Sequence, residues 1–191
     1  MEEKVKISID LMGGDNSPDK TLLGIDLFVK RNKNKNDYFF YLFGDENIVK
    51  KKISKLKYLK SNYKLIDTKI IVSNNLSPLA ALKKGKGSSM WESIHSQISL
   101  NSDVTLSAGN TGVLLVMSKL ILKTMDGINK PALAGLWPND KNMNIVLDLG
   151  ANIDCSEKNL IDFSEMGSAL YRSLFHNETA KVALLNIGSE E

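Results

Sequence analysis

The sequence predicts an α/β protein, a three-layer α/β/α sandwich in which a mostly parallel sheet lies between helices. Two observations support this class. Short apolar runs alternate with longer runs of helical periodicity, and the turns between them are rich in Gly, Asn and Asp. A length of 191 residues with 42% hydrophobic and 25% charged side chains suits one globular domain. We therefore expect residues 1–191 to form a single α/β domain.

The first segments predict a strand, a helix and a second strand. Val5–Asp10 alternates apolar and polar residues and runs into a Gly-rich loop at 11–18, which indicates a strand followed by a turn. Asp19 is a candidate cap for a helix that ends in the polar run at 31–37. Tyr38–Phe43 is aromatic throughout, as expected of a strand covered on both faces.

The middle of the chain continues the alternation. Residues 46–60 are helical in pattern and basic, 69–73 predict a short strand, and Ser77-Pro78 opens a helix with proline in its first turn. A serine-capped helix at 89–100 precedes a strand at 103–107.

The last third predicts a buried helix, three strands and the longest helix of the chain. The expected bounds are 113–123 for the buried helix, 131–137, 144–149 and 181–187 for the strands, and 157–175 for the long helix.

Composition excludes several classes of function. One cysteine, Cys155, and two histidines are too few for an internal disulfide or a closed zinc site, so no metal is expected. The chain lacks a phosphate loop of the ATPase type, a GxSxG nucleophile elbow, a signal peptide and an apolar run long enough to span a bilayer. A net charge of +3 does not indicate nucleic-acid binding. Because only two of the 25 basic residues are arginines, an anion site must use backbone amides, hydroxyls, Asn and Lys.

Four loops at predicted strand ends carry small polar residues: Asp10–Asp15, Ser107–Gly112, Asp148–Asp154 and Asn186–Gly188. Ligands of open α/β sheets bind outside the carboxyl ends of the strands, so these loops are expected to converge on one crevice. The loop at 107–112 suits an anion such as phosphate, since glycines allow close backbone approach and a helix N-terminus favours negative charge. The alternative reading is that these residues only form left-handed turns and helix caps.

Two further features carry weaker hypotheses. Cys155 is either a thiolate nucleophile or a small core thiol, and the second reading is favoured. The lysines between 50 and 64 form either a solvated helix face or a patch that attracts an acidic partner or an anionic membrane.

Several motifs together resemble the bacterial phosphate acyltransferase (PlsX) family. In order, they are Asp10-Leu11-Met12-Gly13-Gly14-Asp15 with Pro18, Ser88-Ser89-Met90, Ser107-Ala108-Gly109-Asn110-Thr111-Gly112, Asp148-Leu149-Gly150-Ala151-Asn152-Ile153-Asp154-Cys155, and Leu185-Asn186-Ile187-Gly188. The resemblance implies transfer of a fatty acyl group from acyl carrier protein to inorganic phosphate, giving acyl phosphate for phospholipid synthesis. It also implies a fold like that of isocitrate and isopropylmalate dehydrogenases, a cytoplasmic homodimer with peripheral membrane contact, and no cofactor.

In that reading phosphate is its own nucleophile, so the site must orient the anion and stabilise an oxyanion. The predicted catalytic residues are Asp10, Asp15, Asn110, Asn152 and Asp154. The predicted substrate-binding residues are Gly13, Gly14, Ser88, Ser89, Ser107, Gly109, Thr111, Gly112, Gly150, Asn186 and Gly188.

Members of the family continue well past the segment that resembles residues 186–188. We therefore expect the 191 residues to fold as most of one lobe, incomplete at its C-terminus, with little or no turnover. Two alternatives stay open at this stage: a phosphotransacetylase-like acyltransferase, and a non-catalytic remnant that binds phosphate or carrier protein.

Overall fold

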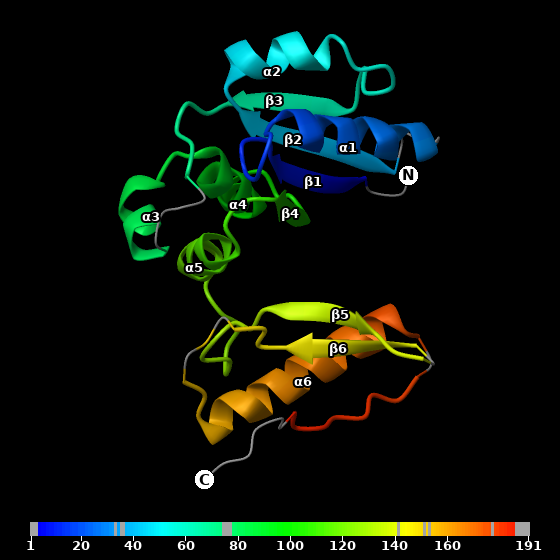
Figure 1. Ribbon diagram of the computed structural model, residues 1–191, viewed down its shortest axis with the longest axis vertical. Helices are drawn as coiled ribbons and strands as arrows, with labels where there is room; N and C mark the ends of the chain where they lie inside the picture. The colour runs from blue at the N-terminus through cyan, green and yellow to red at the C-terminus, as the bar shows by residue number, and fades with distance from the viewer. Residues whose placement is uncertain are drawn as a thin grey trace. The chain divides into compact units, whose positions relative to one another are not determined.

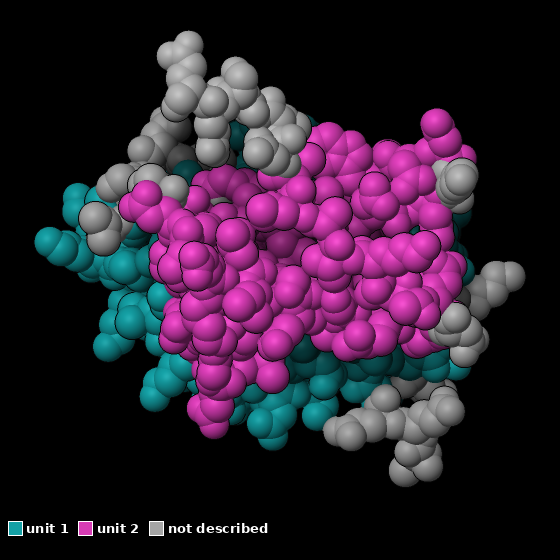
Figure 2. All heavy atoms as spheres, turned by 90° about the horizontal axis from the view of Figure 1, so that it is seen from below, with its two compact units in different colours: residues 1–123 teal, residues 124–191 magenta. Residues whose placement is uncertain are grey.

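A computed structural model describes residues 4–32, 34, 37–73, 78–140, 142–150, 152, 154–176 and 178–185. The chain divides into two compact units, residues 1–123 and 124–191, which are drawn in different colours in Figure 2. Each unit is described by itself below. Whether they act as one domain, as the composition predicts, stays a prediction.

Unit 1 contains a four-stranded sheet in which every neighbouring pair is parallel. Its strand order is β3-β2-β1-β4, so β1 lies in the middle and β4 at one edge (Figure 1). The bounds are β1 Val5–Asp10, β2 Tyr38–Gly44, β3 Tyr63–Asp67 and β4 Val104–Ser107. This confirms the predicted α/β class for the larger unit.

Two helices, α1 (Asp19–Arg31) and α2 (Glu46–Ile53), pack against one face of this sheet. Ile9 and Leu42 point into the same core as Leu22 of α1 and Val49 of α2. The apolar side chains that the helical periodicity predicted therefore cover the strands that the apolar runs predicted.

The opposite face of the sheet is covered by α4 (Ser89–Ser99), which contacts β1, β2 and β4. Buried serines fix this helix, because the Ser8 and Ser96 hydroxyls lie 2.5 Å apart and Ser96 also contacts the Ser102 hydroxyl at 3.1 Å. Behind α4, a second apolar core joins it to α3 (Pro78–Lys84) and α5 (Thr111–Leu122).

The third strand differs from the expectation. Residues 69–73 are not a strand; the strand is Tyr63–Asp67, where half-exposed residues at the sheet edge hide the apolar pattern. The preceding helix ends at Ile53 rather than near 60. Residues 57–59 leave helical geometry to donate backbone hydrogen bonds to the buried Asp26 carboxylate, at 2.7–3.3 Å.

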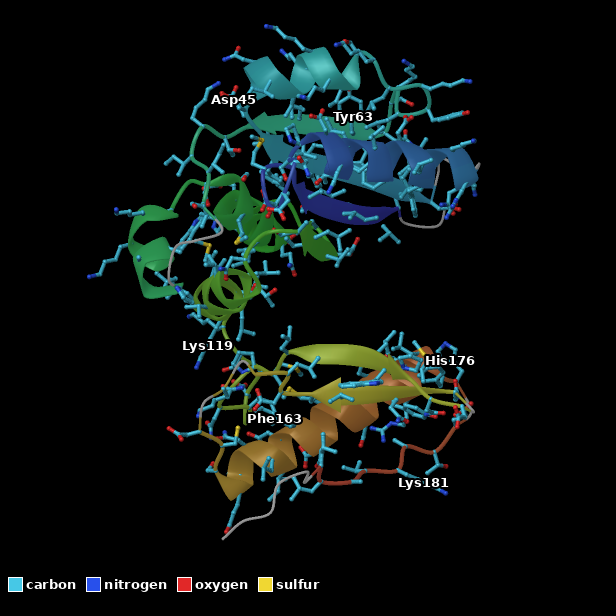
Figure 3. The ribbon with its side chains drawn as sticks, in the orientation of Figure 1. Asp45, Tyr63, Lys119, Phe163, His176 and Lys181 are labelled. Atoms are coloured by element: carbon cyan, nitrogen blue, oxygen red, sulfur yellow. The ribbon has the colours of Figure 1, made fainter. Side chains whose placement is uncertain are left out.

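Unit 2 contains a two-stranded sheet, β5 (Ala134–Pro138) and β6 (Met143–Leu147), packed on α6 (Glu157–Leu174). The two strands pair with each other antiparallel in a sheet of their own, whereas the sequence predicted strands of one mostly parallel sheet. Phe163 of α6, labelled in Figure 3, is buried in this unit. The strand predicted at 181–187 is wrong for residues 181–185, which have no regular structure, and residues 186 and 187 lie outside the described part.

Candidate functional site

Two Gly-rich loops meet at the carboxyl ends of β1 and β4. Asp10 and Ser107, the last residues of these strands, are register partners in the parallel pair. The sheet order changes direction here, since β2 lies on one side of β1 and β4 on the other. Such a switch point is where open α/β sheets bind ligands. The structure thus brings together the loop predicted to suit an anion, 107–112, and one of the loops predicted to converge with it, 10–15.

The Asp10 carboxylate joins the two loops at this corner of unit 1, where β1 and β4 end. It is 1% exposed, and its Oδ1 accepts hydrogen bonds from the N–H groups of Met12 and Gly13, each at 3.1 Å. Its Oδ2 accepts a hydrogen bond from the Ser107 hydroxyl at 2.7 Å. Ser107 Oγ in turn accepts one from the Gly109 N–H at 3.1 Å. One buried carboxylate therefore fixes both loops.

Glycines allow the loops to approach this closely. A Cβ on Gly13 would lie 2.8 Å from Ser107 Oγ and 2.9 Å from the Gly109 nitrogen. Gly14 has a φ of 87°, and a Cβ there would lie 2.6 Å from the Ala108 carbonyl oxygen. Any larger residue would separate the two loops.

The second loop leads directly into α5. Asn110 is the N-cap residue of this helix, and its Oδ1 accepts a hydrogen bond from the Val113 N–H at 3.0 Å. Thr111 and Gly112 form the first turn, where backbone N–H groups have no intrahelical acceptor. The helix dipole adds partial positive charge there. This end of the site suits a phosphate group.

The start of α4 forms another part of the site. Ser88 caps this helix by accepting a hydrogen bond from the Trp91 N–H at 3.2 Å, and both Ser88 and Ser89 are buried. Met90 reaches the second loop, since a Cβ on Gly109 would lie 2.5 Å from the Met90 methyl carbon. Sequence reasoning noted Met90 in the motif without assigning it a role.

A cavity of about 470 Å³ opens beside Asp10 and Ser107. Besides those two residues, its lining includes Lys20 from the first turn of α1. Sequence reasoning missed Lys20 because one lysine among many gives no distinct signal. The remaining lining is mostly apolar and comes from α1, β1, β2 and β4.

The third predicted loop belongs to unit 2 and follows β6. Asn152 donates from its backbone N–H and its side-chain amide to Asp148 Oδ1, at 3.2 and 2.8 Å, and from its amide to the Pro131 carbonyl at 3.2 Å. Asp148 and Gly150 have positive φ values of 62° and 81°. These contacts support the reading of this loop as a left-handed turn with internal hydrogen bonds.

The predicted convergence of four loops is supported for two of them. Asp10 and Ser107 are joined, whereas Asp15, in the same loop as Gly14, is exposed. Asp154 is exposed in unit 2, where its backbone carbonyl accepts a hydrogen bond from Lys130 at 2.7 Å. The fourth loop, with Asn186 and Gly188, lies outside the described residues.

The described residues contain no group of three or more His, Cys, Asp or Glu side chains placed to hold a metal ion. At the ends of β1 and β4 the polar groups are backbone amides, the Ser107 hydroxyl and the buried Asp10 carboxylate. These features define a class of protein: an α/β protein with two Gly-rich loops joined at the switch point of its parallel sheet.

The family follows from a comparison of sequences. Residues 5–191 match the model of the family described as "Fatty acid synthesis protein", so the chain belongs to that family, the PlsX family of phosphate acyltransferases. The resemblance noted in the motifs is thereby confirmed.

Curated relatives of this chain include phosphate acyltransferases. The chain is 54% identical over 191 residues to the phosphate acyltransferase of Pelagibacter ubique, covering 100% of this chain and 56% of that protein. It is 40% identical over 192 residues to the phosphate acyltransferase of Azorhizobium caulinodans, covering 100% of this chain and 53% of that protein. The chain spans about half the length of the curated relatives it matches.

Solved structures support the fold. A phosphotransacetylase from Streptococcus pyogenes matches with a TM-score of 0.61 and 16% identity, over 92% of this chain and 55% of that one. The EutD phosphotransacetylase from Staphylococcus aureus matches with a TM-score of 0.59 and 17% identity, over 89% and 53%. At this identity the likeness concerns the fold alone, and it agrees with the α/β class predicted from sequence.

Proposed function

We propose that this chain provides the phosphate-binding corner of an acyltransferase that moves a fatty acyl group from acyl carrier protein to inorganic phosphate. The observation that carries the proposal is the joining of the Asp10 and Ser107 loops at the N-terminus of α5. Membership of the family supplies the reaction class. Acyl phosphate and the free carrier thiol are the products.

In the proposed step, a phosphate oxygen attacks the thioester carbonyl carbon. A carbon–oxygen bond forms and the carbonyl oxygen becomes an oxyanion. The carbonyl then re-forms as the carbon–sulfur bond breaks, and the released thiolate takes up the proton that the hydrogen phosphate loses. The protein binds the anion with the amides of Thr111 and Gly112 in the first turn of α5, and the Gly109 amide, Ser107 and Asp10 hold the loop in place. No protein nucleophile is needed.

The protonated state of the Cys155 thiol agrees with a mechanism that needs no protein nucleophile. Its thiol donates a hydrogen bond to Asp148 Oδ2 at 3.2 Å. This hydrogen bond, helped by partial desolvation and the Asp148 charge, raises the pKa of Cys155 above its ordinary value. The thiolate form is therefore disfavoured at neutral pH, which argues against a nucleophilic role. The expectation of a core thiol is wrong, because Cys155 is exposed.

The proposed donors are tested at Asn110. Asn110→Ala removes both the side-chain NH₂ donor and the oxygen that caps the helix. Asn110→Asp keeps the capping oxygen and removes only the side-chain NH₂ donor. Loss of one well-placed donor typically lowers turnover by about 10² to 10³. We expect both variants to lose phosphate affinity in titration calorimetry and turnover in the assembled enzyme. Near-full rate and affinity in Asn110→Asp would refute the assignment of the amide.

The substrate is tested by competition. Acyl carrier protein thioesters and acyl coenzyme A are offered together with phosphate, and preferential use of the carrier protein thioester is expected. Preference for coenzyme A would instead favour a phosphotransacetylase. Carrier protein binding without thioester consumption in any assembled form would favour a non-catalytic binding role.

Two further parts of the proposal concern assembly and location. The family resemblance suggests a cytoplasmic homodimer that touches the inner face of the membrane. Among the described residues no helix combines the length and apolarity required to cross a bilayer. Sedimentation and vesicle flotation of the assembled enzyme test both parts.

A further inference from the structure

The first turn of α4 packs against the loop at 107–112, a contact that lies within unit 1. Helix α4 contacts β4 and α5, the two elements that this loop connects (Figure 1). Met90, in that first turn, is 2% exposed, and its terminal methyl carbon lies 2.5 Å from the place that a Cβ on Gly109 would occupy. The Met90 methyl group therefore fills the space beside the Gly109 backbone that a side chain would need.

The loop at 107–112 is held by a polar and by an apolar contact. In the polar contact, the Gly109 N–H donates a hydrogen bond to Ser107 Oγ at 3.1 Å. Met90 supplies the apolar contact, and it shares a core cluster with Val113 of the first turn of α5. Because protein cores are close-packed, a shift of Gly109 toward Met90 meets the methyl group, and a shift away from it opens a void. Packing therefore keeps Gly109 within hydrogen-bond distance of Ser107.

An ordinary core residue is the simpler interpretation of a buried methionine, and such a residue accepts another apolar side chain of similar volume at small cost. Two features set Met90 apart. Its methyl group contacts a backbone segment that has no side chain of its own, and that segment leads directly into the first turn of α5. Reaching this segment takes a long unbranched side chain, since leucine ends one atom earlier.

We infer that Met90 is a positioning residue for phosphate: its methyl group holds Gly109 against Ser107, and the loop so held aims the amides of Thr111 and Gly112 at the anion. Hydrogen bonds weaken steeply with misalignment, so a small shift of this loop lowers affinity even though Met90 itself does not touch phosphate. This inference rests on the proposed function, because it assigns Met90 to the phosphate site of that proposal.

The first test measures inorganic phosphate binding to the full 191-residue chain by titration calorimetry. Met90→Ala removes the methyl contact and should weaken binding about tenfold, and Met90→Leu, a milder change, about threefold. The control is Ile94→Ala, one turn further along α4, because Ile94 lies in the same core and is as deeply buried. It should lower the urea midpoint of unfolding as Met90→Ala does and keep phosphate affinity within about twofold of native.

The second test is a size exchange between two residues. Gly109→Ala should weaken phosphate binding about tenfold, because its Cβ meets the Met90 methyl carbon at 2.5 Å. In the double variant Met90→Ala with Gly109→Ala, the new methyl enters the vacated space, where Ser107 Oγ and the Gly13 Cα lie 3.3 and 3.5 Å away. The double variant should therefore bind phosphate about fivefold more tightly than Gly109→Ala alone. Two unrelated defects would instead add.

A third measurement does not depend on phosphate. Exchange of the Gly109 amide hydrogen with solvent, followed by NMR, should be faster in Met90→Ala than in Ile94→Ala. Native phosphate affinity in Met90→Ala, or a double variant no better than Gly109→Ala, would overturn the inference. If the native chain binds no phosphate, the proposed function fails by itself. The Gly109 exchange rates then decide whether Met90 holds the loop, and equal rates in the two variants would show that it does not.

Discussion

Asp10 is the residue on which the corner depends. Its carboxylate accepts three hydrogen bonds from two loops that are 97 residues apart in sequence at the Ser107 contact. Its predicted role as a residue that orders the crevice agrees with this geometry. The sequence could place Asp10 at a strand end, but its partner depends on which strands are neighbours, and that is a property of the folded sheet.

A substitution at Asp10 tests this dependence. In Asp10→Asn an amide NH₂ replaces one acceptor and faces a donor, so at least one buried group loses its partner. We expect a loss of about 1–3 kcal/mol in the free energy of unfolding, measured by urea denaturation. Asp126→Asn, at an exposed position of unit 2, serves as the control and should be close to neutral. Equal effects at both positions would contradict the role of Asp10.

Two glycines offer a matched pair for a test of close approach. Gly13→Ala places a Cβ 2.8 Å from Ser107 Oγ and should separate the loops, lowering phosphate affinity at least tenfold in calorimetry. Gly24→Ala meets nothing within 4 Å and should raise the stability of the isolated chain by about 0.4–1 kcal/mol. A Gly13→Ala variant with native phosphate affinity would contradict the proposed geometry.

At the scale of elements, the strands were predictable wherever an apolar run or a regular apolar–polar alternation marked them, as in β1, β2 and β4, and the third strand was not. The apolar run of Tyr38–Phe43 directly indicates a buried strand. In β3, at the edge of the sheet, partly buried residues alternate with exposed ones, so the strand was predicted at 69–73 instead. Periodicity reports burial and carries no direction, so the antiparallel pairing of β5 and β6 could not be read from it. Lys20 and Met90 reach the site only through the packing of their helices.

The serine contacts that hold α4 form a small network suited to a double-mutant cycle. Ser96→Ala removes the partner of the buried Ser8 hydroxyl at 2.5 Å and of Ser102 at 3.1 Å. We expect a loss of about 1–2 kcal/mol from the single change, and less than the sum of the two single losses from Ser8→Ala with Ser96→Ala. Thermal or urea unfolding of the four proteins measures this, and strict additivity would contradict a direct interaction.

The connection between α2 and β3 predicts a pH dependence. Burial of Asp26 disfavours its charge, but the N–H groups of residues 57–59 and the charge of Lys60 outweigh it, so its pKa lies below the ordinary 3.8. A carboxyl with a depressed folded-state pKa stabilises the protein above its unfolded pKa and loses that effect as pH falls through the folded value. Unfolding of Asp26→Asn should therefore depend less on pH below about 4 than that of the native chain. Identical pH profiles would contradict this.

For the whole molecule, burial is uneven between the two units. Both apolar core clusters belong to unit 1, whereas Phe163 is the single buried apolar side chain among the described residues of unit 2. We expect amides of β5, β6 and α6 to exchange with solvent faster than those of β1 and β2, as measured by hydrogen-exchange mass spectrometry. Equal protection in both units would show that unit 2 has a support not seen in the described residues.

The long sequence separation between Asp10 and Ser107 also affects how the protein folds as it is synthesised. During synthesis, the loop after Asp10 is made early, and the loop after Ser107 is made only after almost a hundred further residues. The two loops come into contact when β4 pairs with β1. Inorganic phosphate would then bind only molecules that have completed this high-contact-order step. Since a ligand selective for the native state stabilises it by mass action, phosphate bound as proposed would stabilise the folded state of newly made chains.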